Sequence, residues 1–445
     1  ESPTFHSETM AVYPGDKNNL PYDVVVERLH IEEPEPPAPV TEPEKIFEEV
    51  LDEHPVSIQV NGQWQTFPNA KAAEEASYEE YKANLRRNAK NFRITDEHLG
   101  EGGPKAKFQA NVNAIRLLKE LEAAGQQASP EQQEVLSRYV GWGGLSDAFD
   151  PEKPVWALEY AQLKELLTPE EYAAARSSTL NAHYTSPTVI QAIYEAVDRM
   201  GFETGNILEP SMGVGNFFGM LPEKMRNSRL YGVELDPVSG RIAKQLYPKA
   251  DITVGGFETT DRRDFFDLAI GNVPFGQYQV NDKAYNKLNF NIHNYFFAKA
   301  LNQVRPGGVV AFVTSRYTMD AKDSTVRRYL AQRAELLGAI RLPNDAFKKN
   351  AGAEVVSDII FLQKRDRPLD IAPEWTQTGQ TEDGFAINRY FIDHPEMVLG
   401  RQEPVSTAHG MDYTVNPIEG LELSDQLHDA VKYIHGTYQE AELPE

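Results

Sequence analysis

Cysteine is absent from the 445 residues of the chain. Disulfide bonds, thiolate metal ligands and a cysteine nucleophile are therefore excluded. Long apolar runs are lacking as well, and none approaches the roughly 20 residues that a membrane-spanning helix requires. We therefore expect a soluble, cytoplasmic protein without a signal peptide. The first residue is Glu1 rather than Met, so we expect a fragment of a longer protein.

Positive charge is scarce overall, since the formal net charge is −23. The acid lies mostly at the two ends, because residues 1–60 and 371–445 each sum to −11 and residues 61–180 to −4, whereas residues 181–370 sum to +3. A mildly basic centre is compatible with DNA or RNA as a partner. Ordinary surface charge is the alternative interpretation of its basic cluster, which consists of Arg327, Arg328, Arg333, Arg341, Lys348 and Lys349.

Composition and periodicity divide the chain into four predicted parts. These are an acidic Pro/Glu-rich arm or linker (1–60), a hairpin plus helical domain (61–180), a catalytic domain (181–370) and an acidic C-terminal extension (371–445). Asn61 and Gly62 predict the hairpin turn. Two glycine-rich loops, 99–107 and 139–147, interrupt the helical part. We interpret both loops as turns, with ligand contact as the alternative.

Short apolar strands alternate with helices in the third part. Ser186 and Pro187 predict a helix start, and Gly201 predicts its end. Strands are predicted at 206–210, 230–236, 251–254, 265–270, 307–315, 337–343 and 356–365. The last two are close enough in sequence to pair antiparallel. We therefore predict an α/β fold with a Rossmann-like sheet that is mostly parallel with an antiparallel last strand, and with ligands at the carboxyl ends of the strands.

A glycine loop follows the first of these strands. Gly213 and Gly215 allow close approach of the backbone to a ligand, but Phe218 occupies the third glycine position of a dinucleotide fingerprint. Glu209, before the loop, would repel a pyrophosphate. Glu234 ends the next strand, where a carboxylate can bind ribose hydroxyls. A nucleoside with an amino-acid tail and no phosphate fits these features, and we predict S-adenosyl-L-methionine as the cofactor.

The tetrad Asn272-Val273-Pro274-Phe275 resembles the Asn-Pro-Pro-aromatic signature of amino-methyltransferases. "HYTSPTV" (183–189) and "HNYFFAKALNQVRPGGVVAFVTS" (293–315) resemble segments of N6-adenine DNA methyltransferases that place cofactor motifs before the catalytic motif. The resemblance covers roughly residues 180–365 and implies a class I S-adenosylmethionine-dependent methyltransferase fold. It further implies methylation of adenine N6 in DNA, with base flipping.

The resemblance also implies the site residues. The catalytic residues would be Asn272, Val273, Pro274 and Phe275, the substrate-binding residues Tyr278 and Tyr285, and no metal would take part. The cofactor-binding residues would be His183, Tyr184, Thr185, Pro187, Glu209, Pro210, Gly213, Gly215, Asn216, Phe217, Glu234, Asp236 and Phe257.

Two departures from the family pattern bear on activity. Val273 replaces the first proline of the tetrad, where a backbone carbonyl is used, so we expect a working but less rigid loop. Gly256 stands before Phe257 where the family usually has Asp to receive the adenine amino group of the cofactor. That contact is lost unless Glu258 or a backbone group supplies it.

Segments farther upstream, "NFRITDEHLGEGGPKAKFQANVNAIRLL" and "YVGWGGL", resemble the amino-terminal part of large methylase–helicase proteins of bacterial conjugative elements and phages. That resemblance implies a helicase region of the same full-length polypeptide as a partner besides DNA. The missing cysteine excludes C5-cytosine methylation. The open alternatives are methylation of cytosine N4, of RNA or of a protein glutamine, and a catalytically inactive cofactor-binding module that docks on DNA.

Overall fold

The computed structural model describes residues 54–179, 184–347, 355–407 and 410–441. The described residues form two compact units, which divide between Tyr81 and Lys82. The four-part division proposed from the sequence remains a prediction, and most of its first part lies outside the described residues. No helix of the described ranges is long and apolar enough to cross a membrane.

The first unit contains a two-stranded hairpin, β1 (Val56–Val60) and β2 (Gln63–Phe67), followed by the start of α4 (Ala70–Asn88). Asn61 and Gly62 form its turn with φ angles of 52° and 73°. Positive φ at both central residues defines the turn type that Asn-Gly favours, so the predicted hairpin is confirmed.

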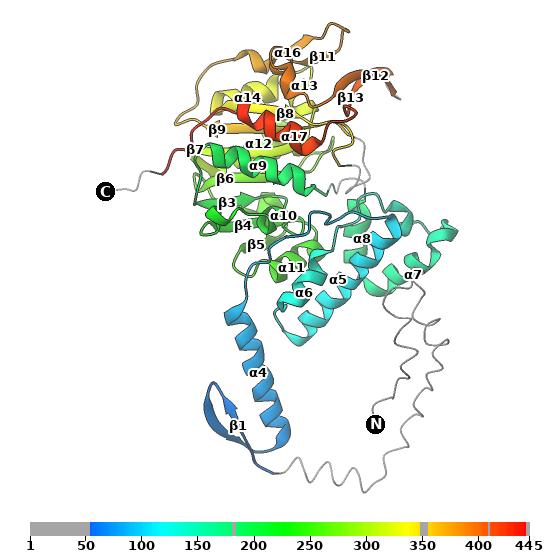
Figure 1. The fold of residues 1–445 in the computed structure, drawn as a ribbon, viewed down its shortest axis with the longest axis vertical. Coiled ribbons are helices and arrows are strands. Elements are labelled where there is room, and N and C mark those ends of the chain that lie inside the picture. Colours follow the sequence, from blue (N-terminus) through cyan, green and yellow to red (C-terminus); the bar gives the residue numbers. More distant parts are fainter. Residues whose placement is uncertain (1–53, 180–183, 348–354, 408–409, 442–445) are drawn as a thin grey trace. The chain divides into compact units, whose positions relative to one another are not determined.

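A seven-stranded sheet forms the centre of the second unit (Figure 1). Its strand order is β5-β4-β3-β6-β7-β9-β8, and only β9 runs antiparallel to its neighbours. The predicted mostly parallel sheet with an antiparallel last strand is thus confirmed, with β9 inserted between β7 and β8. The strands are β3 (Asn206–Glu209), β4 (Arg229–Glu234), β5 (Asp251–Val254), β6 (Phe266–Asn272), β7 (Val304–Ser315), β8 (Ala334–Arg341) and β9 (Ser357–Lys364).

Helices cover this sheet, which explains why β6, β7 and β9 are buried along nearly their whole length. The helix predicted from Ser186 is α9, and its Ser186 side chain accepts a hydrogen bond from the Val189 N–H. The apolar stripe of this helix is buried and consists of Val189, Ile190, Ile193, Tyr194, Val197 and Met200. The covering helices are α9 (Pro187–Arg199), α10 (Asn216–Gly219), α11 (Pro237–Leu246), α12 (Ile292–Gln303), α13 (Tyr317–Asp320), α14 (Thr325–Arg333) and α17 (Leu423–Ala430).

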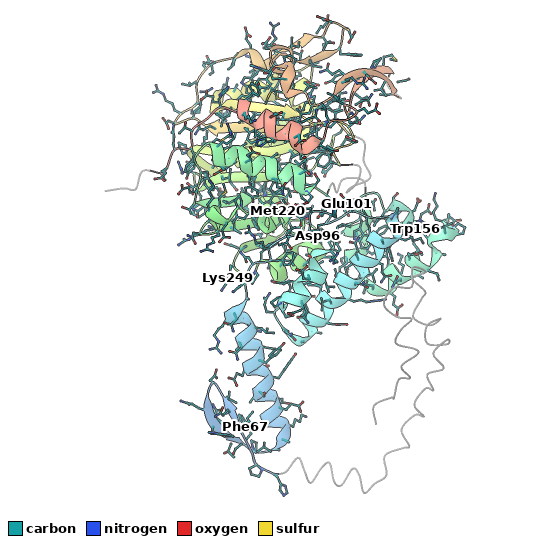
Figure 2. The ribbon with its side chains drawn as sticks, in the orientation of Figure 1. Phe67, Asp96, Glu101, Trp156, Met220 and Lys249 are labelled. Carbon is teal, nitrogen blue, oxygen red and sulfur yellow. The ribbon has the colours of Figure 1, made fainter. Side chains whose placement is uncertain are left out.

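A helical layer, α5 (Pro104–Ala124), α6 (Pro130–Ser137), α7 (Ala157–Leu166) and α8 (Pro169–Ser178), packs on α11. Arg241 of α11 connects two of its helices. The Arg241 guanidinium bonds Glu122 of α5 at 2.7 Å and Glu171 of α8 at 2.9 Å. An extended segment before this layer also lies against the sheet domain, since the Ile94 N–H donates to the Gly219 carbonyl at 2.9 Å. Met220, the next residue, is labelled in Figure 2.

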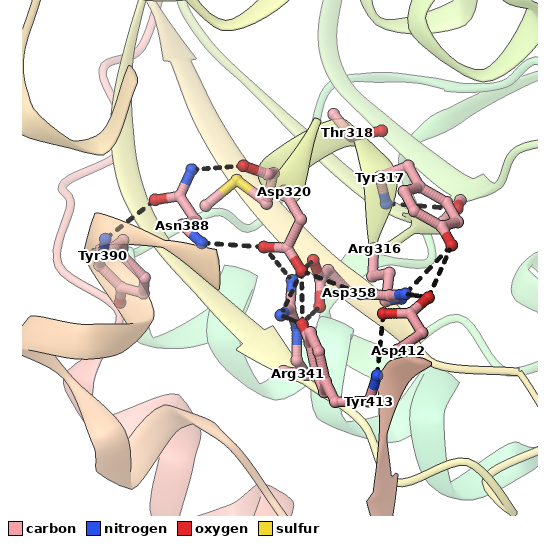
Figure 3. Close-up of polar contacts among 12 residues, drawn as sticks. Arg316, Tyr317, Thr318, Asp320, Arg341, Asp358, Asn388, Tyr390, Asp412 and Tyr413 are labelled. Carbon is pink, nitrogen blue, oxygen red and sulfur yellow. Dashed lines mark hydrogen bonds and ion pairs between the residues drawn. The ribbon is translucent and has the colours of Figure 1, made fainter. Parts of the chain in front are cut away.

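The C-terminal 75 residues were predicted only as an acidic extension. The structure shows instead that they fold onto the sheet domain. Their elements are β10 (Thr378–Gln380), β11 (Ala386–Asn388), α16 (Arg389–Asp393), β12 (Arg401–Thr407), β13 (Gly410–Asn416) and α17. Asn388 donates its backbone N–H to Asp320 at 2.9 Å, and Tyr413 of β13 contacts both Asp320 and Arg341 (Figure 3).

Two members of the basic cluster proposed from the sequence do not lie on the surface. Arg341 is fully buried and binds the carboxylates of Asp320 and Asp358 at 2.8 Å each (Figure 3). Arg327 is also buried and donates to backbone carbonyls, including that of Thr376 at 2.9 Å. Proximity in sequence misled because these side chains point inward. Lys348 and Lys349 lie outside the described residues.

Removal of the Arg341 charge should destabilise the fold strongly. Arg341→Met leaves the buried Asp358 carboxylate without its ion-pair partner at 2.8 Å, and leaves Asp320 only the more distant Arg316 at 3.5 Å. A broken buried pair of this kind costs about 3–5 kcal/mol. Urea denaturation measures the loss. The matched control is Arg389→Met, because Arg389 pairs with Asp393 on the surface and such pairs contribute about 1 kcal/mol or less. Equal losses in the two variants would contradict this prediction.

Candidate active site

A cavity of about 540 Å³ lies at the carboxyl ends of β3, β4 and β6. Parallel strands bring their carboxyl ends to the same edge of a sheet, where such folds bind ligands. The structure brings fourteen of the predicted site residues together in the lining. They are Tyr184, Thr185, Glu209, Pro210, Gly213, Asn216, Phe217, Glu234, Asp236, Phe257, Asn272, Val273, Pro274 and Tyr278.

One end of the cavity is acidic. Glu234 is held by the backbone, since its Oε2 accepts from the Gly213 N–H at 2.6 Å and its Oε1 from the Asp236 N–H at 2.8 Å. Glu209 is 2% exposed, and its Oε2 has no hydrogen-bond partner within the described part of the chain. Three carboxyl groups gathered in one lining form a site that suits a positively charged ligand.

Burial governs the ionisation of these groups. It raises the pKa of Glu234 to about 7, and the nearby charge of Asp236 acts in the same direction. Burial also raises the pKa of Asp236, and it raises the pKa of Glu209 well above its ordinary value, with the charge of Glu234 as a second cause. A cation placed among them would favour the ionised forms.

Asn272, Val273 and Pro274, where β6 ends, form another part of the lining. The Asn272 Nδ2 donates to the Thr185 hydroxyl at 3.1 Å. This contact fixes the side-chain amide and leaves its oxygen as the accepting side. Val273 is buried, and its N–H donates to the Val313 carbonyl at 3.1 Å. A proline could not make that bond, so the expected loosening of the loop is offset by extended pairing with β7.

The second departure, at Gly256, also has a structural counterpart. A Cβ built on Gly256 would lie 2.1 Å from the Glu258 carboxylate. The Glu258 side chain therefore folds back into the space that a side chain at 256 would need, and both residues line the cavity. Phe257 between them is buried, with its ring 5.0 Å from that of Phe296 of α12.

Four predicted site residues lie outside the lining. Pro187 occupies the first turn of α9. Gly215 has a φ of +89°, and a Cβ there would lie 2.6 Å from the Tyr247 ring, so this glycine admits Tyr247 rather than a ligand. Phe275 is half-buried against the core. The Tyr285 hydroxyl accepts from the Asn302 amide at 2.8 Å, which gives it a packing role. His183, the remaining predicted site residue, lies outside the described residues.

Sequence reasoning missed other parts of the lining. The additional residues are Tyr139, Val140, Gly141, Ala174, Ser177, Ser178, Ser211, Met212, Val214, Leu235, Ser239, Gly255, Val280, Ile292 and Phe296. The glycine-rich loop at 139–147 was the available signal for the first three, since ligand contact was the alternative to a turn. The described ranges hold no group of three or more His, Cys, Asp or Glu that could bind a metal ion.

Comparison with known proteins supports the resemblance seen in the sequence. Residues 243–347 match the family model described as Eco57I restriction-modification methylase. The Defense against restriction protein B of Escherichia phage P1 is 27% identical over 280 residues, which are 61% of this chain and 11% of that protein. The Type II methyltransferase M.CvrRI of Paramecium bursaria Chlorella virus XZ-6E is 45% identical over 74 residues, 17% of this chain and 19% of that protein.

Among solved structures, a protein of Listeria monocytogenes assigned to the class I S-adenosylmethionine-dependent methyltransferases is 18% identical. The match covers 61% of this chain and 90% of that chain, with a TM-score of 0.39. The resemblance to DNA methyltransferases is confirmed by the family match and the viral relative, and the sheet topology is that of the predicted fold class. The chain spans only about a tenth of the phage relative.

Proposed function

We propose that this chain is an S-adenosyl-L-methionine-dependent DNA methyltransferase that methylates the N6 amino group of adenine. The observation that carries the proposal is the place of Asn272. Its amide, at the end of β6, lines the same cavity as Glu209, Glu234 and Asp236. An amide that can orient an amine thus lies in one cavity with carboxylates suited to a cationic nucleoside.

The carboxylates fit the proposed cofactor on chemical grounds. The buried Oε2 of Glu209 and Oδ1 of Asp236 have no hydrogen-bond partners within the described segments. A ligand with ribose hydroxyls would donate hydrogen bonds to such oxygens, and its positive charge would balance their negative charge. When bound, the cofactor supplies an activated methyl group on a cationic sulfur. The protein's contribution is then mainly positioning rather than acid–base chemistry.

The tetrad would hold the target amine. The Asn272 Oδ1 and the Val273 carbonyl would accept the two amino hydrogens, which directs the nitrogen lone pair towards the methyl group. An adenine in duplex DNA must leave the base stack to reach this position. Tyr278, which lines the cavity and is 49% exposed, is our candidate for stacking on the flipped base. Base–aromatic stacking of this kind contributes about 1–3 kcal/mol.

DNA is the proposed substrate because the matched family model and the viral relative are named for restriction-modification and type II methylation. The low share of the phage relative covered here supports a longer full-length polypeptide, in which a helicase region is the proposed partner. The mildly basic sum of residues 181–370 is compatible with DNA.

A methyl-transfer assay tests this assignment. The protein is incubated with labelled S-adenosylmethionine and with DNA, RNA or protein, and the labelled DNA is digested to nucleosides. We expect label in N6-methyladenine. Label in N4-methylcytosine, RNA or protein would contradict the substrate. Cofactor binding without any transfer would favour an inactive DNA-docking module, the alternative that Gly256 and Val273 first suggested.

Thr185 should affect the rate through Asn272. Thr185→Val removes the hydroxyl that accepts a hydrogen bond from the Asn272 Nδ2. Because the Asn272 amide can then rotate, we expect kcat to fall about tenfold. Thr185→Ser keeps the hydroxyl and should retain most of the rate. Single-turnover methylation measures both variants at saturating cofactor. If Thr185→Ser loses as much kcat as Thr185→Val, the hydrogen bond is not the cause.

A further inference from the structure

The helical layer α5–α8 contributes a loop to the cavity, although the family match begins only at residue 243. Tyr139, Val140 and Gly141, which follow α6, line the cavity beside the residues of the sheet domain. Gly141 has a φ of +73°, a conformation that glycine adopts without strain.

A fully buried side chain fixes this loop. The Oδ1 of Asn111 in α5 accepts from the Val140 N–H at 2.9 Å, and its Nδ2 donates to the Gly141 carbonyl at 2.6 Å. One amide thus satisfies a donor and an acceptor of a loop that has no strand partner. Buried polar groups that are fully paired rigidify their surroundings, so the loop is built to hold its position.

Tyr139 directs its side chain towards the start of α11. The residue is 1% exposed, and its ring packs edge-on against Trp142. Its hydroxyl lies beside Ser239 and near Asp236. The Asp236 Oδ2 caps α11, because it accepts from the Ser239 N–H at 2.8 Å and from the Ser239 hydroxyl at 2.6 Å.

Two polar atoms remain unsatisfied at this place. Neither the Tyr139 hydroxyl nor the Asp236 Oδ1 makes a hydrogen bond of normal geometry within the described chain, although both are shielded from solvent. A buried group without a partner costs about 1–3 kcal/mol. The Tyr139 hydroxyl can donate a hydrogen bond, and the Asp236 Oδ1 can accept one. A single ligand hydroxyl could therefore bind both, because it would accept from Tyr139 and donate to Asp236.

The relative placement of the two atoms is secured by α11 itself. Asp236 caps the amino-terminal end of α11, and Arg241, one turn later, binds Glu122 and Glu171 of the helical layer. Gln133 of α6 also donates to the Gln245 carbonyl of α11 at 3.0 Å. The helix that presents Asp236 therefore also anchors the layer that presents Tyr139.

We propose that the helical layer forms one wall of the cofactor site and that Tyr139, together with Asp236, binds a ribose hydroxyl of the nucleoside. This inference rests on the proposed cofactor. Glu234, beside Asp236 at the end of β4, is available for the neighbouring hydroxyl of the same ribose. Tyr139 is a binding residue in this proposal and takes no part in the methyl transfer.

The test uses Tyr139→Phe, which removes only the hydroxyl. Calorimetric titration with S-adenosylhomocysteine should give a Kd about tenfold higher than for the unaltered protein, in line with one lost hydrogen bond. Titration with the 2′-deoxy and 3′-deoxy analogues of that ligand identifies the partner. For the analogue that lacks the contacted hydroxyl, the two proteins should differ less than twofold.

The matched control is Tyr172→Phe. Tyr172 is also a buried tyrosine of the layer, but its hydroxyl bonds the Phe149 carbonyl and it does not line the cavity. The affinity of Tyr172→Phe for S-adenosylhomocysteine should equal that of the unaltered protein. Without ligand, Tyr139→Phe should be at least as thermally stable as the unaltered protein, because an unpaired hydroxyl is removed. Its gain in Tm on adding ligand should be smaller.

Two results would overturn this inference while leaving the proposed function intact. One is an unaltered Kd for all three ligands in Tyr139→Phe, and the other is an equal loss for all three, which would indicate a change of cavity shape. Failure of the unaltered protein to bind S-adenosylhomocysteine at all would instead overturn the proposed cofactor and this inference with it.

Discussion

Asn272→Ala should abolish most methyl transfer, about a thousandfold in kcat, while the Kd for S-adenosylmethionine changes less than twofold. The Asn272 amide ends β6 and bonds Thr185, whereas Glu234 and Asp236 lie at and just after the end of β4, two strands away in the sheet. A group that orients the reacting amine acts on the transition state more than on cofactor binding. Removal of one such preorganised contact commonly costs a hundredfold to a thousandfold.

Asn272→Asp is the informative companion variant. A carboxylate keeps an accepting oxygen at the same place and can accept from the Thr185 hydroxyl, so it should retain more activity than alanine. Rapid-quench methylation gives kcat, and calorimetry gives the Kd. Activity of the alanine variant within tenfold of the unaltered protein would show that Asn272 does not orient the amine.

The second large effect is a pH dependence of cofactor affinity that originates in Glu234. Its pKa of about 7 in the free protein, raised chiefly by burial, means that half of the molecules carry a neutral carboxyl at that pH. A cationic ligand binds the ionised form, so protonation competes with it as the pH falls. Linkage then predicts a Kd about tenfold higher at pH 6 than at pH 8, with little change above pH 8.

Glu234→Gln provides the control. The substitution removes the titrating group, so the Kd should no longer depend on pH between 6 and 8. At pH 8 the Kd of the variant should be higher than that of the unaltered protein. The stability of the free protein depends on pH in the opposite direction to its affinity for the cofactor. A carboxyl whose pKa is higher in the folded state than its ordinary 4.5 makes the free protein less stable as the pH rises from about 4.5 to 7. A Kd of the unaltered protein that is flat from pH 6 to 8 would remove Glu234 from the cofactor site.

Local patterns predicted the sheet domain well, because each pattern has a local cause. The Ser186 cap and the apolar stripe of α9 lie within one helix, and β6 is an apolar run that ends at the tetrad. The order of motifs along the chain then placed Glu209, Gly213, Glu234 and Asn272 at one edge, since parallel strands end together.

What the sequence could not show depends on contacts between distant residues. Gly215 was interpreted as a ligand contact, yet its freedom admits the ring of Tyr247, 32 positions away. Arg341 seemed to belong to a basic patch, but its carboxylate partners come from other elements. Tyr139 lines the cavity only because the helical layer docks on α11, and no local sequence pattern specifies that docking.

The overlap between positions 256 and 258 limits how this site can change. An aspartate introduced at 256 while Glu258 keeps its present rotamer would collide with that carboxylate and place two negative charges side by side. Glu258 is exposed, and the atoms that overlap are the far end of its flexible side chain. A residue introduced at 256 would therefore turn the Glu258 carboxylate outward, away from the cavity that it now lines. Relatives with an acidic residue at 256 should carry a shorter or outward-facing side chain at 258.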